Sequence, residues 1–157
     1  MTQNRRMRVA IASDHGGFEY KTILLQEIKL NGYDVTDLGA FKQVDTDDYP
    51  DFASMVADSI MNKKAEKGIL ICGSGAGVSV VANKFKGIKA AVCHDTYSAH
   101  QCVEHDDVNV LCIGQRVIGI ELAREIVLTF LAAQFSHAER HERRLKKVID
   151  IENKNMK

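Results

Sequence analysis

Short apolar runs alternate with longer helical stretches along nearly the whole chain, and this alternation restricts the fold more than any other feature. The runs are almost continuously apolar, which is typical of strands that are covered on both faces. We therefore predict five strands, at residues 8–13, 33–37, 68–72, 88–92 and 108–113.

The stretches between the strands have helical spacing. Helices are predicted after Gly16–Gly17, after Pro50, from the glycine run at 73–77 and from Asp95. Two more follow the last strand, one after Gly119 and one over about 138–153. Strand–helix alternation predicts an α/β fold, a three-layer αβα sandwich with a five-stranded parallel Rossmann-like sheet of order 2-1-3-4-5. Ligands of such sheets bind beyond the carboxyl ends of the strands.

Length and composition exclude several classes of protein. A chain of 157 residues suits a single domain, and we expect residues 1–6 to be a frayed extension. Lysine plus arginine and aspartate plus glutamate each total 21, and this balance argues against a nucleic-acid partner. No apolar stretch reaches the roughly 18 residues of a membrane span. The cysteines form no CxxC pair, so we expect reduced, buried thiols, no metal site and a cytoplasmic location; they are Cys72, Cys93, Cys102 and Cys112.

A glycine-rich loop follows the third predicted strand and begins at Cys72. Glycines 73, 75 and 77 let the backbone approach a ligand and direct its N–H groups at an anion, and a helix N-terminus behind them favours a thiolate. The spacing is G-x-G-x-G rather than the G-x-G-x-x-G of dinucleotide-binding loops, so nucleotide binding is a weaker reading. A tight structural turn with a buried strand-end thiol is the alternative without a ligand.

Two histidines lie where they could reach a ligand. Asp14 and His15 follow the first strand, whose carboxyl end neighbours that of the third; a helix cap and a surface histidine are the plainer readings. His105 is expected at a helix C-terminus beside Asp106 and Asp107, a setting that favours the imidazolium. A solvated histidine on a charged turn is the alternative.

The last predicted helix has two arginines without local partners. Spacing pairs Glu139 with Arg143, Glu142 with Lys146 and Lys147 with Asp150, whereas Arg140 and Arg144 have no acidic residue three or four positions away. Two guanidiniums on one face suit an external dianion such as a phosphate ester. A solvated basic face, or pairing with a partner subunit's carboxylates, is the alternative.

Taken together, these motifs resemble the type B ribose-5-phosphate isomerases, in the family that also holds galactose-6-phosphate isomerase subunits. The matching segments occur in family order and extend over nearly the whole chain. They are residues 13–17, 48–50, 68–77, 82–84 and 114–116, together with His105 and Asp107, and Arg140, His141 and Arg144.

The resemblance implies an aldose–ketose isomerase that interconverts D-ribose 5-phosphate and D-ribulose 5-phosphate through an enediolate, with no cofactor. It implies that Cys72 moves a proton between C1 and C2, that Ser74 shuttles a proton between the two oxygens, and that His105 opens the sugar ring. It implies substrate contacts by Asp14, His15, Tyr49, Gly73, Gly75, Ala76, Gly77, Asp106, Arg116, Arg140 and Arg144, the three arginines holding the phosphate. It also implies a homodimer or dimer of dimers with shared active sites and with the last helix at the interface.

One position departs from the family pattern. Asp106 stands where the family usually has asparagine, and an ionised carboxylate accepts hydrogen bonds but cannot donate one.

Two other functions stay open at this point. A six-carbon sugar phosphate, allose or galactose 6-phosphate, would use the same chemistry, and a sugar-phosphate-binding module would use the same pocket without catalysis.

Overall fold

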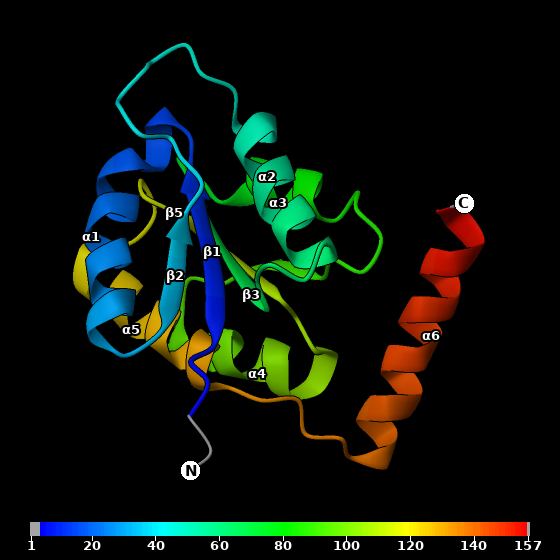
Figure 1. Ribbon diagram of the computed structural model, residues 1–157. Coiled ribbons are helices and arrows are strands. Elements are labelled where there is room, and N and C mark those ends of the chain that lie inside the picture. The colour runs from blue at the N-terminus through cyan, green and yellow to red at the C-terminus, as the bar shows by residue number, and fades with distance from the viewer. Residues whose placement is uncertain (1–3, 157) are drawn as a thin grey trace.

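A five-stranded parallel sheet forms the centre of the computed structural model, which describes residues 4–156 (Figure 1). Every pair of neighbouring strands runs parallel, as predicted. The strands are β1 (Arg8–Ser13), β2 (Asp34–Asp37), β3 (Lys67–Cys72), β4 (Ala90–Val92) and β5 (Val110–Gly114). The predicted strands match these apart from small differences at their ends.

The order of the strands corrects the prediction. The sheet has the order β2-β1-β3-β5-β4, whereas 2-1-3-4-5 was predicted. β5 is buried along its whole length and pairs with β3, while β4 has three residues and is only partly covered. A short, partly exposed strand suits the edge of a sheet. As a consequence, the loop after β5 lies directly beside the loop after β3.

Helices cover both faces of the sheet and give the predicted three layers. α1, α4 and α5 pack on one face, and α2 and α3 pack on the other. The helical elements are the short 3-10 helix η1 (His15–Gly17), α1 (Phe18–Leu30), α2 (Tyr49–Met61), α3 (Ala76–Ala82), α4 (Thr96–Asp106), α5 (Ile120–Ala132) and α6 (Glu139–Asn155).

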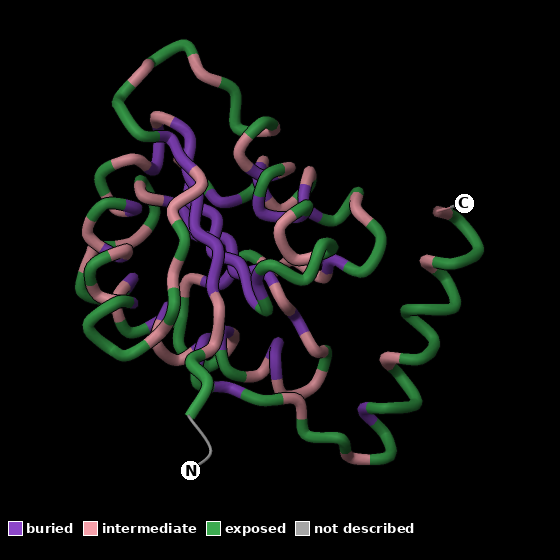
Figure 2. Tube along the Cα trace, viewed as in Figure 1, coloured by how far each residue is buried: buried purple, intermediate pink, exposed green. Residues whose placement is uncertain are grey.

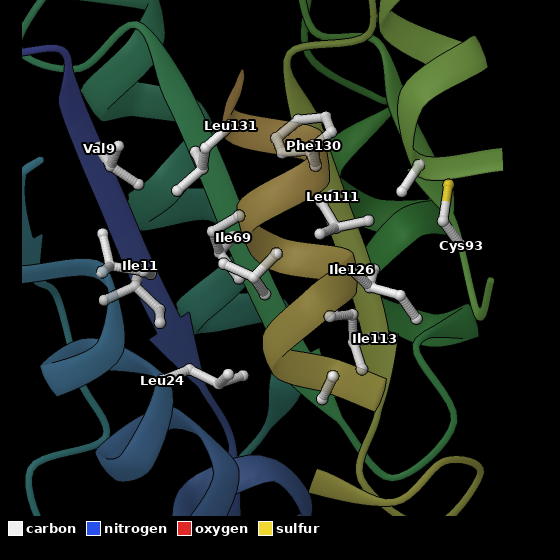
Figure 3. Close-up of a cluster of buried hydrophobic side chains, with 14 of the residues drawn as sticks. Val9, Ile11, Leu24, Ile69, Cys93, Leu111, Ile113, Ile126, Phe130 and Leu131 are labelled. Carbon is white, nitrogen blue, oxygen red and sulfur yellow. The ribbon is translucent and has the colours of Figure 1, made fainter. Parts of the chain in front are cut away.

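Each face of the sheet has its own apolar core, because successive strand residues point to opposite faces. Figure 3 shows the larger core, where Ile126 and Phe130 of α5 lie against Ile69 and Leu111 of the sheet. The opposite core is shallower, and a Cβ added at Gly68 would come within 2.4 Å of Val56 Cγ1. Glycine in β3 therefore lets α2 lie close to the strands that carry the candidate site.

A buried lysine attaches the end of α5 to the sheet. Lys67, the first residue of β3, donates from Nζ to the carbonyl oxygens of Phe130 and Ala133, both at 2.8 Å. Its ammonium lies 4.8 Å from the centre of the Phe130 ring. Burial lowers the pKa of Lys67 to about 8. This lysine fixes the point from which the chain leaves the core toward α6.

The last helix stands apart from the sheet, as Figures 1 and 2 show. It contacts α4 near its beginning, where His141 is buried, and Glu152 farther along accepts a hydrogen bond from the Gly87 amide at 2.8 Å. A groove of about 680 Å³ lies between α6 and the body of the protein. The exposed apolar side chains of α6 are Val148, Ile149 and Ile151.

The first described residues are exposed, whereas the cysteines are buried. The extension predicted at residues 1–6 falls partly outside the described residues, which begin at Asn4; residues 4–6 are exposed, and Arg5 forms an ion pair with Glu66 at 3.2 Å. All four cysteines are buried and free. No helix of the described part of the chain is long and apolar enough to cross a membrane.

Candidate active site

The loop from β3 to α3 holds the thiol of Cys72 against a backbone amide. Cys72 Sγ accepts a hydrogen bond from the Gly75 N–H at 3.0 Å, and the side chain is 5% exposed. Gly75 has φ +79°, and a Cβ there would lie 3.0 Å from the carbonyl carbon of Ile113. Ser74 Oγ accepts from the Ala76 amide at 3.2 Å. The loop therefore places a thiol, a hydroxyl and several backbone N–H groups side by side.

A pocket of about 370 Å³ opens above this loop, at the carboxyl ends of the central strands. It is lined by residues from four separate parts of the sequence, which is what the predicted meeting of strand ends requires. The lining residues are Asp14, Tyr49, Cys72, Gly73, Ser74, Gly77, Arg116 and Val117. The predicted site residues in this list do come together.

Close backbone packing holds the loops of this pocket in place. A Cβ at Gly16 would lie 2.9 Å from the Gly73 nitrogen, so the loop after β1 rests directly on the loop after β3. From the other side, the Arg116 amide donates to the Gly73 carbonyl at 3.1 Å. This hydrogen bond forms because β5 is the neighbour of β3 in the sheet. The corrected strand order therefore explains why Arg116 reaches the pocket.

The loop after β1 carries Asp14 and His15 in different settings. Asp14 caps η1 by accepting from the Gly16 amide at 2.9 Å, as the cap reading expected, and burial raises the pKa of its carboxyl. His15 is about one-third exposed, and its Nδ1 lies 2.7 Å from Asp47 Oδ1. The hydrogen bond to Asp47 raises the pKa of His15. The sequence reasoning missed Asp47, although the acidic run before Pro50 was a visible signal.

Asp14, His15 and Asp47 are also the residues whose side-chain atoms come close enough to hold a cation, within 4.8 Å of one another among the described residues. His15 Nδ1 lies at hydrogen-bond distance from Asp47 Oδ1, 2.7 Å, and this contact requires the proton to be on Nδ1 when Asp47 is ionised. A protonated Nδ1 has no lone pair for a metal. His15 and Asp47 therefore form a hydrogen-bonded pair, and the Asp14 carboxylate lies beside it.

A second group of predicted site residues lies at the opposite end of the sheet. His105 and Asp106 end α4, just before β5, and Arg140 and Arg144 lie in the first half of α6. Figure 1 shows α4 and the start of α6 far from η1 and the start of α2. Cys72 pairs with Gly114 at the carboxyl end of β5, and the four strand steps back to Val110 span about 13 Å. One chain therefore does not bring these residues to the Cys72 pocket.

Two histidines stack within this second group. The rings of His105 and His141 have centroids 4.1 Å apart and an interplanar angle of 28°. Gln101 Nε2 lies 2.9 Å from His105 Nδ1, and the Ser136 hydroxyl contacts His141 Nδ1. Burial, followed by the positive charges of His105, Arg140 and Arg144, lowers the pKa of His141. These surroundings favour the neutral form of the His141 ring.

Comparison with known proteins identifies the family of the chain. The family model described as Ribose/Galactose Isomerase matches residues 9–148. The chain belongs to this family. It is 42% identical to ribose-5-phosphate isomerase B of Escherichia coli over 147 residues, which are 94% of this chain and 97% of that one. It is 40% identical to D-erythrulose-4-phosphate isomerase of Pectobacterium atrosepticum over 129 residues, 82% of this chain and 85% of that one.

A solved structure of the family gives the same fold. Ribose-5-phosphate isomerase B from Mycoplasma genitalium with bound ribulose-5-phosphate matches with a TM-score of 0.89 and 41% identity, over 95% of this chain and 98% of that one. The protein therefore shares the architecture of a ribose/galactose isomerase from the sheet to the last helix.

In this ribose/galactose isomerase, the ion pairs formed by the charged residues of α6 agree only partly with the predicted ones. Arg143 and Glu139 form the expected ion pair at 2.8 Å. Lys146 instead pairs with Asp150 at 2.6 Å, and Glu142 pairs with His137 at 2.7 Å, because these partners lie within reach on the neighbouring turn and on the preceding loop. Arg140 and Arg144 are exposed and form no ion pair among residues 4–156, as predicted.

The sequence reasoning also missed His94 beside the site. This residue follows β4, and its Nε2 accepts a hydrogen bond from the Gly114 amide at 2.9 Å. Burial lowers the pKa of His94, which keeps the ring neutral and able to accept. His94 thereby supports the carboxyl end of β5, from which the Arg116 loop departs. The predicted and the observed strand orders both place β4 next to β5, but the contact depends on how the chain turns after β4, and the apolar pattern does not record that turn.

Proposed function

We propose that this chain interconverts D-ribose 5-phosphate and D-ribulose 5-phosphate through an enediolate, as a step of the pentose phosphate pathway. The observation that carries the proposal is the Cys72 thiol, held at 3.0 Å from the Gly75 amide on the floor of a pocket that also contains Ser74 and Arg116. Moving a proton next to a carbonyl requires a base, donors for the developing oxyanion and a path for the hydroxyl proton. These residue types meet all three needs.

The proposed mechanism uses the side chains of this pocket in turn. Cys72 as thiolate removes the proton from C2 of the open-chain aldose, and the electron pair forms the C1–C2 double bond of the enediolate. The backbone N–H groups of 73–77 stabilise the oxygen that becomes negative, and Ser74 carries a proton between the two oxygens. Return of the proton from Cys72 to C1 completes the ketose. Asp14 and Tyr49 orient the sugar, and Arg116 binds its phosphate.

We infer that the remaining residues come from a second copy of the chain. In the proposed mechanism His105 opens the sugar ring and Arg140 and Arg144 bind the phosphate. These residues and Asp106 lie at the far end of the sheet from Cys72. A homodimer in which each α4–α6 end meets the partner's Cys72 pocket completes both sites. The exposed apolar residues of α6 support its position at the interface. A cytoplasmic location accords with four free cysteines.

The proposed reaction is tested by exchange of the C2 proton of ribose 5-phosphate in D₂O, followed by NMR together with turnover. We expect the wild type to incorporate deuterium and Cys72→Ala to lose nearly all exchange, while its circular dichroism spectrum stays unchanged. Cys93→Ala, which removes a buried thiol outside the pocket, should keep the activity. Binding of ribose 5-phosphate by the wild type without exchange would mean a binding module instead, and wild-type turnover by Cys72→Ala would remove Cys72 as the base.

A four-carbon substrate is the second candidate, because relatives of nearly the same identity are named D-erythrulose-4-phosphate isomerases. The chain length of the sugar sets the distance between the carbon that meets Cys72 and the phosphate that meets the arginines. Comparing kcat/KM for ribose 5-phosphate, erythrulose 4-phosphate and the six-carbon allose and galactose 6-phosphates decides between them. We expect the five-carbon substrate to give the highest value.

A further inference from the structure

The loop between β2 and α2 is attached to the loop after β1 along much of its length. At its start, the Ser13 amide donates to Gly39 O and the Ala40 amide donates to Ser13 O, both at 2.8 Å. In its middle, Gln43 Nε2 donates to the His15 carbonyl at 3.0 Å. These contacts fix the position from which Asp47 approaches His15.

One carboxylate oxygen of Asp47 receives two hydrogen bonds from the same histidine. Oδ1 accepts from the His15 backbone N–H at 2.9 Å and lies 2.7 Å from its ring Nδ1. The second oxygen, Oδ2, is buried and has no hydrogen-bond partner within residues 4–156. Buried carboxylates without a partner are rare because desolvation is costly. His15 is therefore the group that compensates the charge of Asp47.

The charges around the ring all favour its protonated form. Asp47 acts through the hydrogen bond, and the carboxylates of Asp14 and Asp45 act through space, so that the pKa of His15 is raised. With Nδ1–H directed at Asp47, Nε2 is the ring atom left free, on a side chain that is 31% exposed. A protonated ring presents this atom as a charged N–H donor, which binds an anionic oxygen more strongly than a neutral one.

We propose that Asp47 is a positioning residue that orients His15 and maintains it as a cationic Nε2–H donor for an anionic oxygen of the sugar phosphate. The inference rests on the proposed function, because it assumes that His15 meets the substrate there. Among residues 4–156, the side-chain hydrogen bonds of Asp47 are made to His15 alone. Its removal should therefore weaken substrate binding more than it slows the proton transfer at Cys72.

The test compares three variants in steady-state kinetics across pH. Asp47→Asn keeps an acceptor oxygen but removes the charge, and Asp47→Ala removes both. We expect KM for ribose 5-phosphate to rise about three- to tenfold in each, as for loss of charge assistance from one hydrogen bond, with little change in kcat. Asp45→Asn removes a charge from the same loop that acts on the ring only through space, so its KM should rise much less than that of Asp47→Asn.

The pH dependence separates a charge effect from a structural one. Since Asp47 raises the pKa of His15, the wild type should keep the cationic ring to a higher pH, and the fall of kcat/KM with rising pH should begin earlier in Asp47→Asn. An NMR titration of the His15 ring carbon and proton signals measures the same shift without turnover. An unchanged His15 titration in Asp47→Asn would overturn the proposal even if the enzyme proved to act on another sugar.

A double-mutant cycle shows whether Asp47 acts through His15. In a His15→Gln background, Asp47→Asn should have no further effect on KM, because the group it acts on is gone. Additive effects would contradict the proposal, as would loss of activity on treatment with a chelator, which would mean that Asp14, His15 and Asp47 hold a metal ion. Failure of the wild type to isomerise any sugar phosphate would instead count against the proposed function.

Discussion

Gly77 has no side chain, and the space that a side chain would fill is occupied by the Tyr49 ring. A Cβ there would lie 2.9 Å from Tyr49 Cε2 and 3.0 Å from Cζ. Tyr49 is 41% exposed, so its ring can move outward. Gly77 therefore affects the pocket through the position of Tyr49, while its own backbone conformation is ordinary for a helix.

Gly77→Ala should separate stability from binding. Alanine favours a helix by roughly 1 kcal/mol over glycine, which offsets the cost of displacing an exposed ring. We expect the free energy of unfolding in urea to stay within about 1 kcal/mol of the wild type and KM to rise several-fold. Val80→Ala, on the exposed face of the same helix, is the control and should leave KM unchanged. A wild-type KM in Gly77→Ala would mean that Tyr49 does not contact the substrate.

The sequence could predict that several site residues lie close together, because the loops that follow neighbouring parallel strands meet at the same edge of the sheet. This argument brought Asp14, Cys72 and Ser74 together correctly. Asp47 escaped it, since its place depends on how a long loop folds back over the end of β1, and no periodic pattern records that path. The same holds for the His105–His141 stack, which depends on the angle at which α6 leaves α5.

At the scale of elements, the order of the strands in the sheet depends on how deeply each strand is buried, and the periodicity of the sequence does not give that order. The apolar runs identified all five strands, but the prediction placed β4 beside β3, whereas in the sheet β5 pairs with β3 and β4 lies at the edge. The short β4 and the fully buried β5 carry the information that would have corrected it. The contact between Lys67 and the end of α5 could not be predicted either, because no sequence pattern links this lysine to the carbonyl groups of residues 130 and 133.

Lys67 should give this connection a characteristic pH dependence. The pKa of Lys67 is about 8 in the folded state, below the ordinary lysine value of about 10.4, so the unfolded chain binds more protons between these values. Stability due to this group therefore rises with pH from about 8 to 10, by up to roughly 3 kcal/mol. Urea denaturation of the wild type and Lys67→Met over this range should show a rise in the wild type relative to the variant.

Parallel curves for the two proteins would mean that Lys67 is solvated in the folded state. Lys89→Met is a suitable control, because Lys89 is a partly exposed lysine that pairs with Asp107 at 3.3 Å. Its substitution should leave the pH dependence between 8 and 10 close to that of the wild type.

At the scale of the whole molecule, the proposed active site is larger than one chain. The Cys72 pocket and the group formed by His105, Arg140 and Arg144 lie at opposite ends of the sheet. Under the proposed function, each chain therefore carries two half-sites that cannot meet each other. Two-fold symmetry lets two copies complete two sites at once.

Mixed dimers test this arrangement directly. A heterodimer of Cys72→Ala and His105→Ala chains, isolated through two different tags, places both defects in one site and leaves the other intact. It should regain about half the wild-type activity, although each homodimer is nearly inactive. A heterodimer of Cys72→Ala and Ser74→Ala has one defect in each site and should stay inactive. No recovery in the first heterodimer would mean that each site is built within a single chain.

The separation of the two half-sites has a consequence for the behaviour of the enzyme in dilute solution. A folded, undamaged chain on its own would be catalytically silent, so specific activity would depend on protein concentration and decline as subunits dissociate. The interface would then serve as an on–off element, because any condition that separates the chains would stop the reaction without unfolding them.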